Sequence, residues 1–142
     1  MRGYKPTPDA PVYTPFTTLS ELVKKHTGKS PFKAPQAELD AFNAKRFGPY
    51  LFSDVNDVPV DFLSDLDITG GNSGSPTLNA KGEIVGLAFD GNYEGVASDW
   101  LFLPESTRTI HVDSRYMMWM ADAVSGAASL LKELKQPAAF AK

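Results

Sequence analysis

The sequence contains no cysteine, only two histidines and no long apolar run. The lack of cysteine excludes a disulfide scaffold and a thiolate metal site. The two histidines, His26 and His111, are far apart in the chain, which makes a zinc site an unfavourable interpretation. No stretch is long enough to cross a membrane, and no apolar run follows the first residues, so we expect neither a membrane span nor a signal peptide in this chain.

A large net charge is also missing. The formal net charge of −3 over 142 residues gives no electrostatic reason to expect nucleic acid or acidic lipid as a partner. A hydrophobic fraction of 42% and a charged fraction of 22% are ordinary for a globular domain. The eleven prolines and eleven glycines predict many turns, as in a β-rich fold. We expect one compact domain without a cofactor.

Local patterns predict helices at both ends and strands between them. Thr18 and Glu21 fit a capping box for a short helix from Leu19 to His26, and Pro35 suits the start of a second helix ending near Arg46. Strands are expected over 58–63, 77–78, 83–89 and 109–112, with short ones near 12–14 and 100–103. Apolar residues at helical spacing predict one long C-terminal helix: Met117, Met120, Val124, Ala127, Leu131 and Leu134. Residues 136–142 should be frayed. The single domain then divides into a leading segment (1–56), a core (57–113) and the helix with its tail (114–142).

The most informative stretch runs from Thr69 to Pro76, Thr-Gly-Gly-Asn-Ser-Gly-Ser-Pro. Clusters of this composition usually mark surface turns. A phosphate-binding loop is disfavoured because no Gly-Lys-Ser/Thr follows. The layout is that of the nucleophile loop of chymotrypsin-like peptidases, in which Ser73 is the nucleophile and the amides of Gly71 and Ser73 form the oxyanion hole. Asn72 stands where the usual aspartate would be, so activation by a newly cut N-terminus is not expected. Asp67 is interpreted as an acceptor that orders this loop.

The partners of such a serine are not evident. A serine nucleophile needs a base, normally a histidine oriented by a carboxylate. His26 is predicted to be a solvated cation at a helix C-terminus, and His111 a half-buried structural residue on a strand. The chain also has strands for only one β-barrel, whereas chymotrypsin-like catalysis uses two. We therefore expect a serine-bearing half of a larger enzyme.

Three ordered motifs resemble the bacterial dipeptidyl-peptidase 7 and 11 family, which are serine exopeptidases that remove dipeptides from peptide N-termini. The motifs are 67–76, 86–95 and 108–116, and the segments 13–18 and 57–64 are also similar. The resemblance implies a catalytic histidine and aspartate upstream of this chain, a periplasmic or cell-surface location and a homodimer.

The resemblance also assigns two residues of the pocket. Asp90, seventeen positions after Ser73, matches the aspartate that binds the α-ammonium group of the substrate. From the residues alone, Asp90 would be a turn aspartate. Gly91 matches the position at which members cleaving after acidic residues carry arginine, so apolar or aromatic P1 residues are expected.

The predicted fold is therefore mainly β with α: one chymotrypsin-like β-barrel, short N-terminal helices and a long C-terminal helix. The predicted function is the serine-bearing part of a dipeptidyl peptidase, inactive alone, with peptide as substrate. Two alternatives stay open: a small self-contained serine hydrolase using His26 or His111, and a non-catalytic interaction domain. Exposed apolar surface on such a half should cause self-association.

Overall fold

The computed structural model describes all residues, 1–142, and the chain forms two compact units. The first unit contains residues 1–17 and 61–114, and the second contains residues 18–60 and 115–142. The division into 1–56, 57–113 and 114–142 is a different one, made along the sequence, and it stays a prediction.

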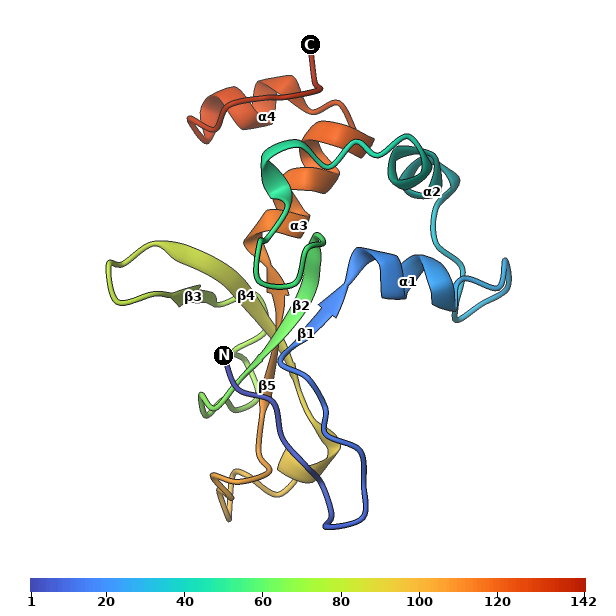
Figure 1. Ribbon diagram of the computed structural model, residues 1–142. Helices are drawn as coiled ribbons and strands as arrows, with labels where there is room; N and C mark the ends of the chain where they lie inside the picture. The colour runs from blue at the N-terminus through green and yellow to red at the C-terminus, as the bar shows by residue number, and fades with distance from the viewer. The chain divides into compact units, whose positions relative to one another are not determined.

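A single sheet carries the five strands, in the order β1-β2-β5-β4-β3 (Figure 1). The strands are β1 (Phe16–Thr18), β2 (Pro59–Ser64), β3 (Pro76–Leu78), β4 (Ile84–Gly91) and β5 (Thr109–Asp113). β5 pairs antiparallel with both β2 and β4, so it lies in the middle of the sheet. The four predicted strands 58–63, 77–78, 83–89 and 109–112 thus correspond to β2, β3, β4 and β5.

The predicted closed barrel is not formed. The strand order has two different edges, β1 and β3, and each of these strands has only three residues. A barrel closes only when its two edge strands pair along their length, and such short edges supply no closing ladder. The predicted short strand at 100–103 is also absent, because Trp100 ends a turn in which its N–H donates to the Ala97 carbonyl, and residues 101–103 pair with no strand. The observed architecture is therefore an open, mainly antiparallel sheet with helices.

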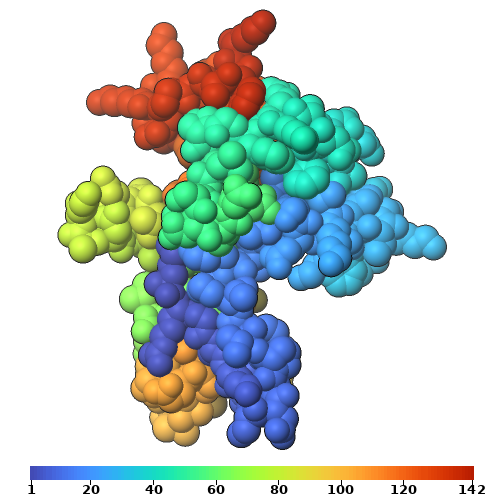
Figure 2. All heavy atoms as spheres, viewed as in Figure 1, coloured from blue at the N-terminus to red at the C-terminus, as the bar shows by residue number.

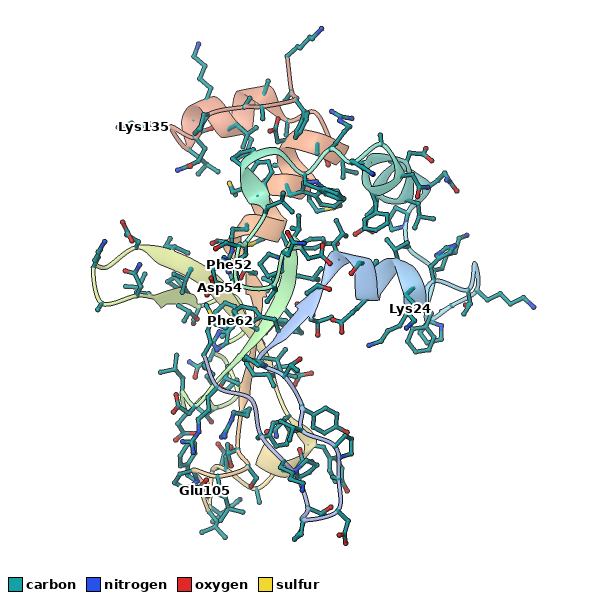
Figure 3. All side chains as sticks on the ribbon, viewed as in Figure 1. Lys24, Phe52, Asp54, Phe62, Glu105 and Lys135 are labelled. Carbon is teal, nitrogen blue, oxygen red and sulfur yellow. The ribbon has the colours of Figure 1, made fainter.

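The interior of the first unit lies under β2, β4 and β5. Phe62 on β2, labelled in Figure 3, is buried and stacks on the His111 ring of β5 at a centroid distance of 4.6 Å. Gly86 on β4 closes this layer, because a Cβ there would lie 2.5 Å from the Val112 carbonyl oxygen and 2.6 Å from the Phe62 ring. The bare glycine backbone thus lets three strands meet around one aromatic pair.

The helices of the second unit begin as predicted but end earlier. α1 (Leu19–Lys25) starts at the predicted capping box, where the Thr18 N–H donates to Glu21 Oε2 at 2.9 Å. α2 (Gln36–Asn43) has Pro35 as its N-cap and stops before Lys45, whose φ of 54° is left-handed and ends the helix. The polar residues of α2 do not all face solvent, because Glu38 is buried and accepts a hydrogen bond from the Tyr116 hydroxyl at 2.7 Å.

The predicted long C-terminal helix is wrong. The chain instead forms α3 (Ser114–Trp119), a π-helical turn η3 (Met120–Val124) and, after a break, α4 (Ala128–Glu133). The break lies at Gly126, whose φ of +62° leaves the helical region. The apolar spacing was correct in part, because Leu131 is fully buried, but it continued across a residue that interrupts the helix.

The C-terminal tail is not frayed. The carboxylate of Asp122, in η3, accepts the backbone N–H groups of Ala139, Phe140 and Ala141 at 2.6–2.9 Å, and the Tyr50 hydroxyl at 2.8 Å. Figure 2 shows the C-terminal residues in red against the green-cyan segment around residue 48. Asp122 is fully buried, and its hydrogen bonds attach the tail to the second unit.

Candidate active site

Ser73 lies in the loop between β2 and β3, and its side chain is exposed. Gly71 and Gly74 on either side have φ of +101° and +84°, a region that favours glycine. Two hydrogen bonds attach the loop to β4: Gly74 N–H to the Ala88 carbonyl at 2.7 Å, and Ala88 N–H to the Ser75 carbonyl at 2.9 Å. The bend around Ser73 is therefore fixed to the sheet, while Ser73 itself is exposed.

The amide groups of this loop fall into two sets. The N–H groups of Asn72, Gly74 and Ser75 all donate within the chain, at 2.7–3.1 Å. The N–H groups of Gly71 and Ser73 donate to no acceptor in the chain, and no atom lies within 4 Å of a Cβ built on Gly71. The two amides predicted to form an oxyanion hole are thus available to an external acceptor.

The loop is ordered by Asn72 and not by Asp67. Asn72 Oδ1 accepts the Thr69 N–H at 3.0 Å, and its carbonyl accepts the Ser75 N–H at 2.9 Å. Asp67 is exposed and makes no hydrogen bond, so the role expected for it is taken by the residue beside the serine. An asparagine side chain closing a turn on a nearby backbone amide is a common local motif.

A pocket of about 340 Å³ opens beside Ser73. One wall comes from the serine loop and the other from the end of β4 with the residues that follow it. The lining includes Ile68, Ser73, Phe89, Asp90, Gly91 and Tyr93. The structure therefore brings the predicted nucleophile together with both predicted substrate-binding residues, although they are separated by β3 and a hairpin turn.

The wall at the end of β4 is shaped by an irregularity. The pairing of β4 with β5 shifts between Ala88 and Asp90, as at a β-bulge. Such a bulge re-aims the side chains that follow it. Asp90 is exposed on the pocket, and its Oδ1 accepts the N–H of Gly91 at 2.8 Å. One carboxylate oxygen is thereby held by the backbone, which limits the orientations of the group.

His111 is not available as a base for Ser73. Its Nε2 lies 2.6 Å from the Ser64 hydroxyl and its Nδ1 lies 2.8 Å from the Thr77 hydroxyl. Burial, and second the positive charge of the N-terminus, lower the pKa of His111 to about 4. The structural role predicted for it is confirmed, and its burial is complete rather than partial.

His26 also has a local role. It forms the C-cap of α1, and its Nδ1 accepts the Ala34 N–H at 3.0 Å. The sequence predicted a solvated cation there, whereas the ring connects the end of α1 to the segment before α2.

Two buried polar residues near the pocket were not identified from the sequence. Asn92 lines the pocket and is buried, and Arg108, the residue before β5, is 1% exposed. In the sequence, Asn92 belongs to an Asp-Gly-Asn run that is typical of a turn, and a single arginine such as Arg108 is typical of a surface position. Their position inside the motifs 86–95 and 108–116 was the available signal.

The described chain shows no group of three or more histidine, aspartate or glutamate side chains arranged to hold a metal ion. None of its helices combines the length and apolar character that crossing a membrane requires.

Comparison with known proteins places these features in a family. The Peptidase S46 family matches residues 1–136. The Asp/Glu-specific dipeptidyl-peptidase of Shewanella putrefaciens is 48% identical over 89% of this chain, and dipeptidyl-peptidase 7 of Capnocytophaga gingivalis is 45% identical over 86% of it.

A solved structure, Porphyromonas endodontalis DPP11 in complex with the dipeptide Arg-Glu, superposes with a TM-score of 0.90 at 35% identity over 96% of this chain. The chain covers 20%, 17% and 19% of these three proteins, so it spans about a fifth of their length. The loop, the sheet and the pocket thus occur in a chain that belongs to the Peptidase S46 family.

Proposed function

We propose that this chain is the nucleophile-bearing part of a serine exopeptidase that releases dipeptides from the N-termini of peptides. The proposal rests on two features that occur together. Ser73, Asp90 and Gly91 line one pocket, and the N–H groups of Gly71 and Ser73 beside it have no acceptor in the chain.

In this reaction the Ser73 hydroxyl oxygen attacks the carbonyl carbon after the second residue of the substrate. A base takes the hydroxyl proton, and the N–H groups of Gly71 and Ser73 donate to the oxyanion that forms. The base then protonates the leaving amine, and water releases the dipeptide from Ser73.

The histidine and aspartate of this mechanism come from sequence outside the present chain. The full engagement of both His111 nitrogens supports this inference, as does the finding that the relatives are about five times longer. The isolated chain is therefore inactive.

Asp90 binds the α-ammonium group of the substrate. A carboxylate with one oxygen held by a backbone N–H keeps its other oxygen for a charge-assisted bond. Placement in the same pocket as Ser73 supports this role, because an exopeptidase must sense the chain end close to the bond it cuts.

The preferred substrates are peptides with an apolar or aromatic residue at P1. No lysine or arginine lines the pocket, and Gly91 adds no side chain, while Ile68, Phe89 and Tyr93 supply apolar surface. Relatives named dipeptidyl-peptidase 7 and relatives named Asp/Glu-specific are found at similar identity, so overall similarity does not choose between the two preferences. The lining of the pocket favours the apolar one.

The same proposal includes a periplasmic or cell-surface location and a homo-oligomer. Tyr93 and Trp100 are 87% and 93% exposed, and exposed aromatic surface of this kind favours self-association. Light scattering on the isolated chain tests this part, and a monodisperse monomer would contradict it.

A chimera tests the central proposal. This chain replaces the matching fifth of the Shewanella putrefaciens relative, and a fluorophosphonate probe and dipeptide release are measured, with Ser73→Ala as control. We expect labelling at Ser73 and cleavage of peptides with a free N-terminus, but not of their N-acetylated forms. A folded chimera that neither labels nor cleaves would favour a non-catalytic interaction domain. Rapid labelling of the isolated chain would instead indicate a self-contained hydrolase.

A further inference from the structure

The pocket wall formed by Asp90 to Gly95 begins with the last two pairs of β4 with β5, Asp90–Ile110 and Gly91–Thr109, and the segment beyond Gly91 includes only a short 3₁₀ turn, η2 (Tyr93–Gly95). Such a segment has few hydrogen bonds of its own to fix it. In Figure 1 the N-terminal segment, in blue, runs beside the loops between β4 and β5, in yellow to orange. The contacts between these segments involve buried polar groups.

Asn92 is the first of these groups. Its Nδ2 donates to the Ser106 carbonyl at 2.7 Å and to Glu94 Oε2 at 2.8 Å, and its Oδ1 accepts the Arg108 N–H at 2.7 Å. Its own N–H donates to the Arg108 carbonyl at 2.9 Å. Both side-chain donors are therefore used, one within the pocket wall and one to the loop before β5, and the two bonds with Arg108 join the wall to the residue that precedes β5.

Glu94 extends the contacts to the N-terminal segment. Its Oε2 accepts the Tyr4 hydroxyl at 2.8 Å as well as the Asn92 amide. Gly95 leaves room for this arrangement, because a Cβ there would lie 3.0 Å from Asn92 Oδ1. The Tyr4 hydroxyl thus reaches a carboxylate two residues beyond Asn92.

Arg108 fixes the other side. A guanidinium has five N–H donors, and here they meet five backbone carbonyls at 2.6–3.2 Å. Three of these carbonyls belong to the loop before β5, which contains Glu105 (Figure 3). The other two belong to Arg2 and Gly3. The buried charge is thus satisfied entirely by main-chain oxygen atoms of two segments far apart in sequence.

We propose that Asn92, Glu94 and Tyr4 are positioning residues, which hold the pocket wall carrying Asp90 and Gly91 through the frame built on Arg108. This inference rests on the proposed function. The residues act on substrate selection through the wall, and none of them is needed for the bond-breaking step.

The chain offers a matched pair of variants for the test. Tyr4→Phe and Tyr50→Phe each remove one tyrosine hydroxyl that donates to a carboxylate at 2.8 Å. Only Tyr4 connects to the pocket wall, since Tyr50 bonds to Asp122 in the second unit. Both variants, with Glu94→Ala and Glu94→Gln, are made in the chimera described above.

The measured quantity is the ratio of kcat/KM for a dipeptidyl substrate with the preferred P1 residue to that for its alanine counterpart. This ratio does not depend on the concentration of active enzyme, so partial unfolding leaves it unchanged. We expect Tyr4→Phe and Glu94→Ala to lower the ratio about threefold to tenfold, the effect of losing one hydrogen bond. Glu94→Gln keeps an acceptor oxygen and should restore most of it. Tyr50→Phe should leave it unchanged.

An unchanged ratio in Tyr4→Phe and Glu94→Ala, or an equal change in Tyr50→Phe, would overturn the proposal. If the chimera proves inactive, the proposed function fails, but the positioning role is still measured by hydrogen exchange in this chain. Tyr4→Phe should then speed exchange of the amides of residues 90–95 severalfold, whereas Tyr50→Phe should not. Equal exchange in both variants would refute positioning independently of activity.

Discussion

The Ser64 hydroxyl and His111 Nε2 lie 2.6 Å apart in a buried pair between β2 and β5. On the same strand pair, Asp61 is opposite Val112, next to the buried Asp113. Burial, and second the negative charge of Asp113, raise the pKa of Asp61 to about 6, whereas the pKa of His111 is lowered to about 4. Two groups with opposite shifts thus titrate in one unit.

These shifts make opposite contributions to stability between about pH 4 and pH 6. His111 binds its proton more weakly in the folded state than its ordinary value of 6.5 implies, so its contribution weakens the fold as the pH falls below 6.5. Asp61 binds its proton more tightly than its ordinary value of 3.8 implies, so its contribution is present at low pH and is lost as the pH rises through about 6. In the unmodified protein the two terms offset each other.

Asp61→Asn should reveal the pH dependence of stability that His111 contributes. Removing the Asp61 titration leaves a free energy of unfolding that falls more steeply with decreasing pH than in the unmodified protein, by at most about 1.4 kcal/mol per pH unit between pH 6 and pH 4. Urea unfolding across this range measures the difference, and the unmodified protein is the control. Parallel curves for the two proteins would contradict the assignment.

Asp122 should be essential for the second unit. Burial opposes its ionisation, but the N–H groups of Ala141, Ala139 and Phe140 and the Tyr50 hydroxyl keep its pKa below the ordinary value. Asp122→Asn replaces one acceptor oxygen with an NH2 group that faces these donors, and should lower the free energy of unfolding by about 2–4 kcal/mol, whereas Tyr50→Phe should lower it by about 1 kcal/mol. Chemical denaturation measures both. Equal, small effects would mean that the tail contributes little.

Gly91→Arg should change the substrate preference of the chimera. A guanidinium at this position adds a cation to a pocket wall that has none. The kcat/KM for substrates with Asp or Glu at P1 should rise by tenfold or more relative to apolar P1 residues, about the worth of one charge-assisted hydrogen bond. Gly91→Gln, long but uncharged, serves as the control. An equal effect of both variants would show that size and not charge was responsible.

Gly86→Ala should destabilise the first unit. The added Cβ would meet the Val112 carbonyl oxygen and the Phe62 ring, and forcing a methyl into a packed interior costs about 1–3 kcal/mol. Gly70→Ala is the matched control, since no atom lies within 4 Å of its Cβ position and its φ is not positive. Thermal unfolding compares them, and a similar melting temperature for both variants would refute the packing argument.

Local chemistry explains which elements could be predicted from the sequence. The capping box of Thr18 and Glu21, the alternation along β5 and the turn between β3 and β4 each depend on neighbouring residues, and all three form. The glycine-flanked serine is of the same kind, because the residues that allow its bend are adjacent to it. The pairing of Ser73 with Asp90 in one pocket came from the family resemblance.

Long-range partners explain the rest. Nothing near Asp122 in the sequence indicates that the amides of residues 139–141 will reach it, and nothing near Arg108 indicates the carbonyls of residues 2 and 3. Trp100 and its apolar neighbours resemble a strand in composition, but composition does not reveal that no strand lies beside them to pair. Buried charges are hard to predict because each depends on acceptors or donors that the fold supplies.

Arg108 makes the folding of the first unit depend on its amino-terminal residues. Two of its five acceptors, the carbonyls of Arg2 and Gly3, are contributed about a hundred residues earlier in the chain, so the guanidinium is fully satisfied only after this amino-terminal segment has docked. Truncating the chain so that it starts after Gly3 would leave two N–H groups of the buried Arg108 without acceptors. The yield of folded protein should therefore drop abruptly when residues 1–3 are removed.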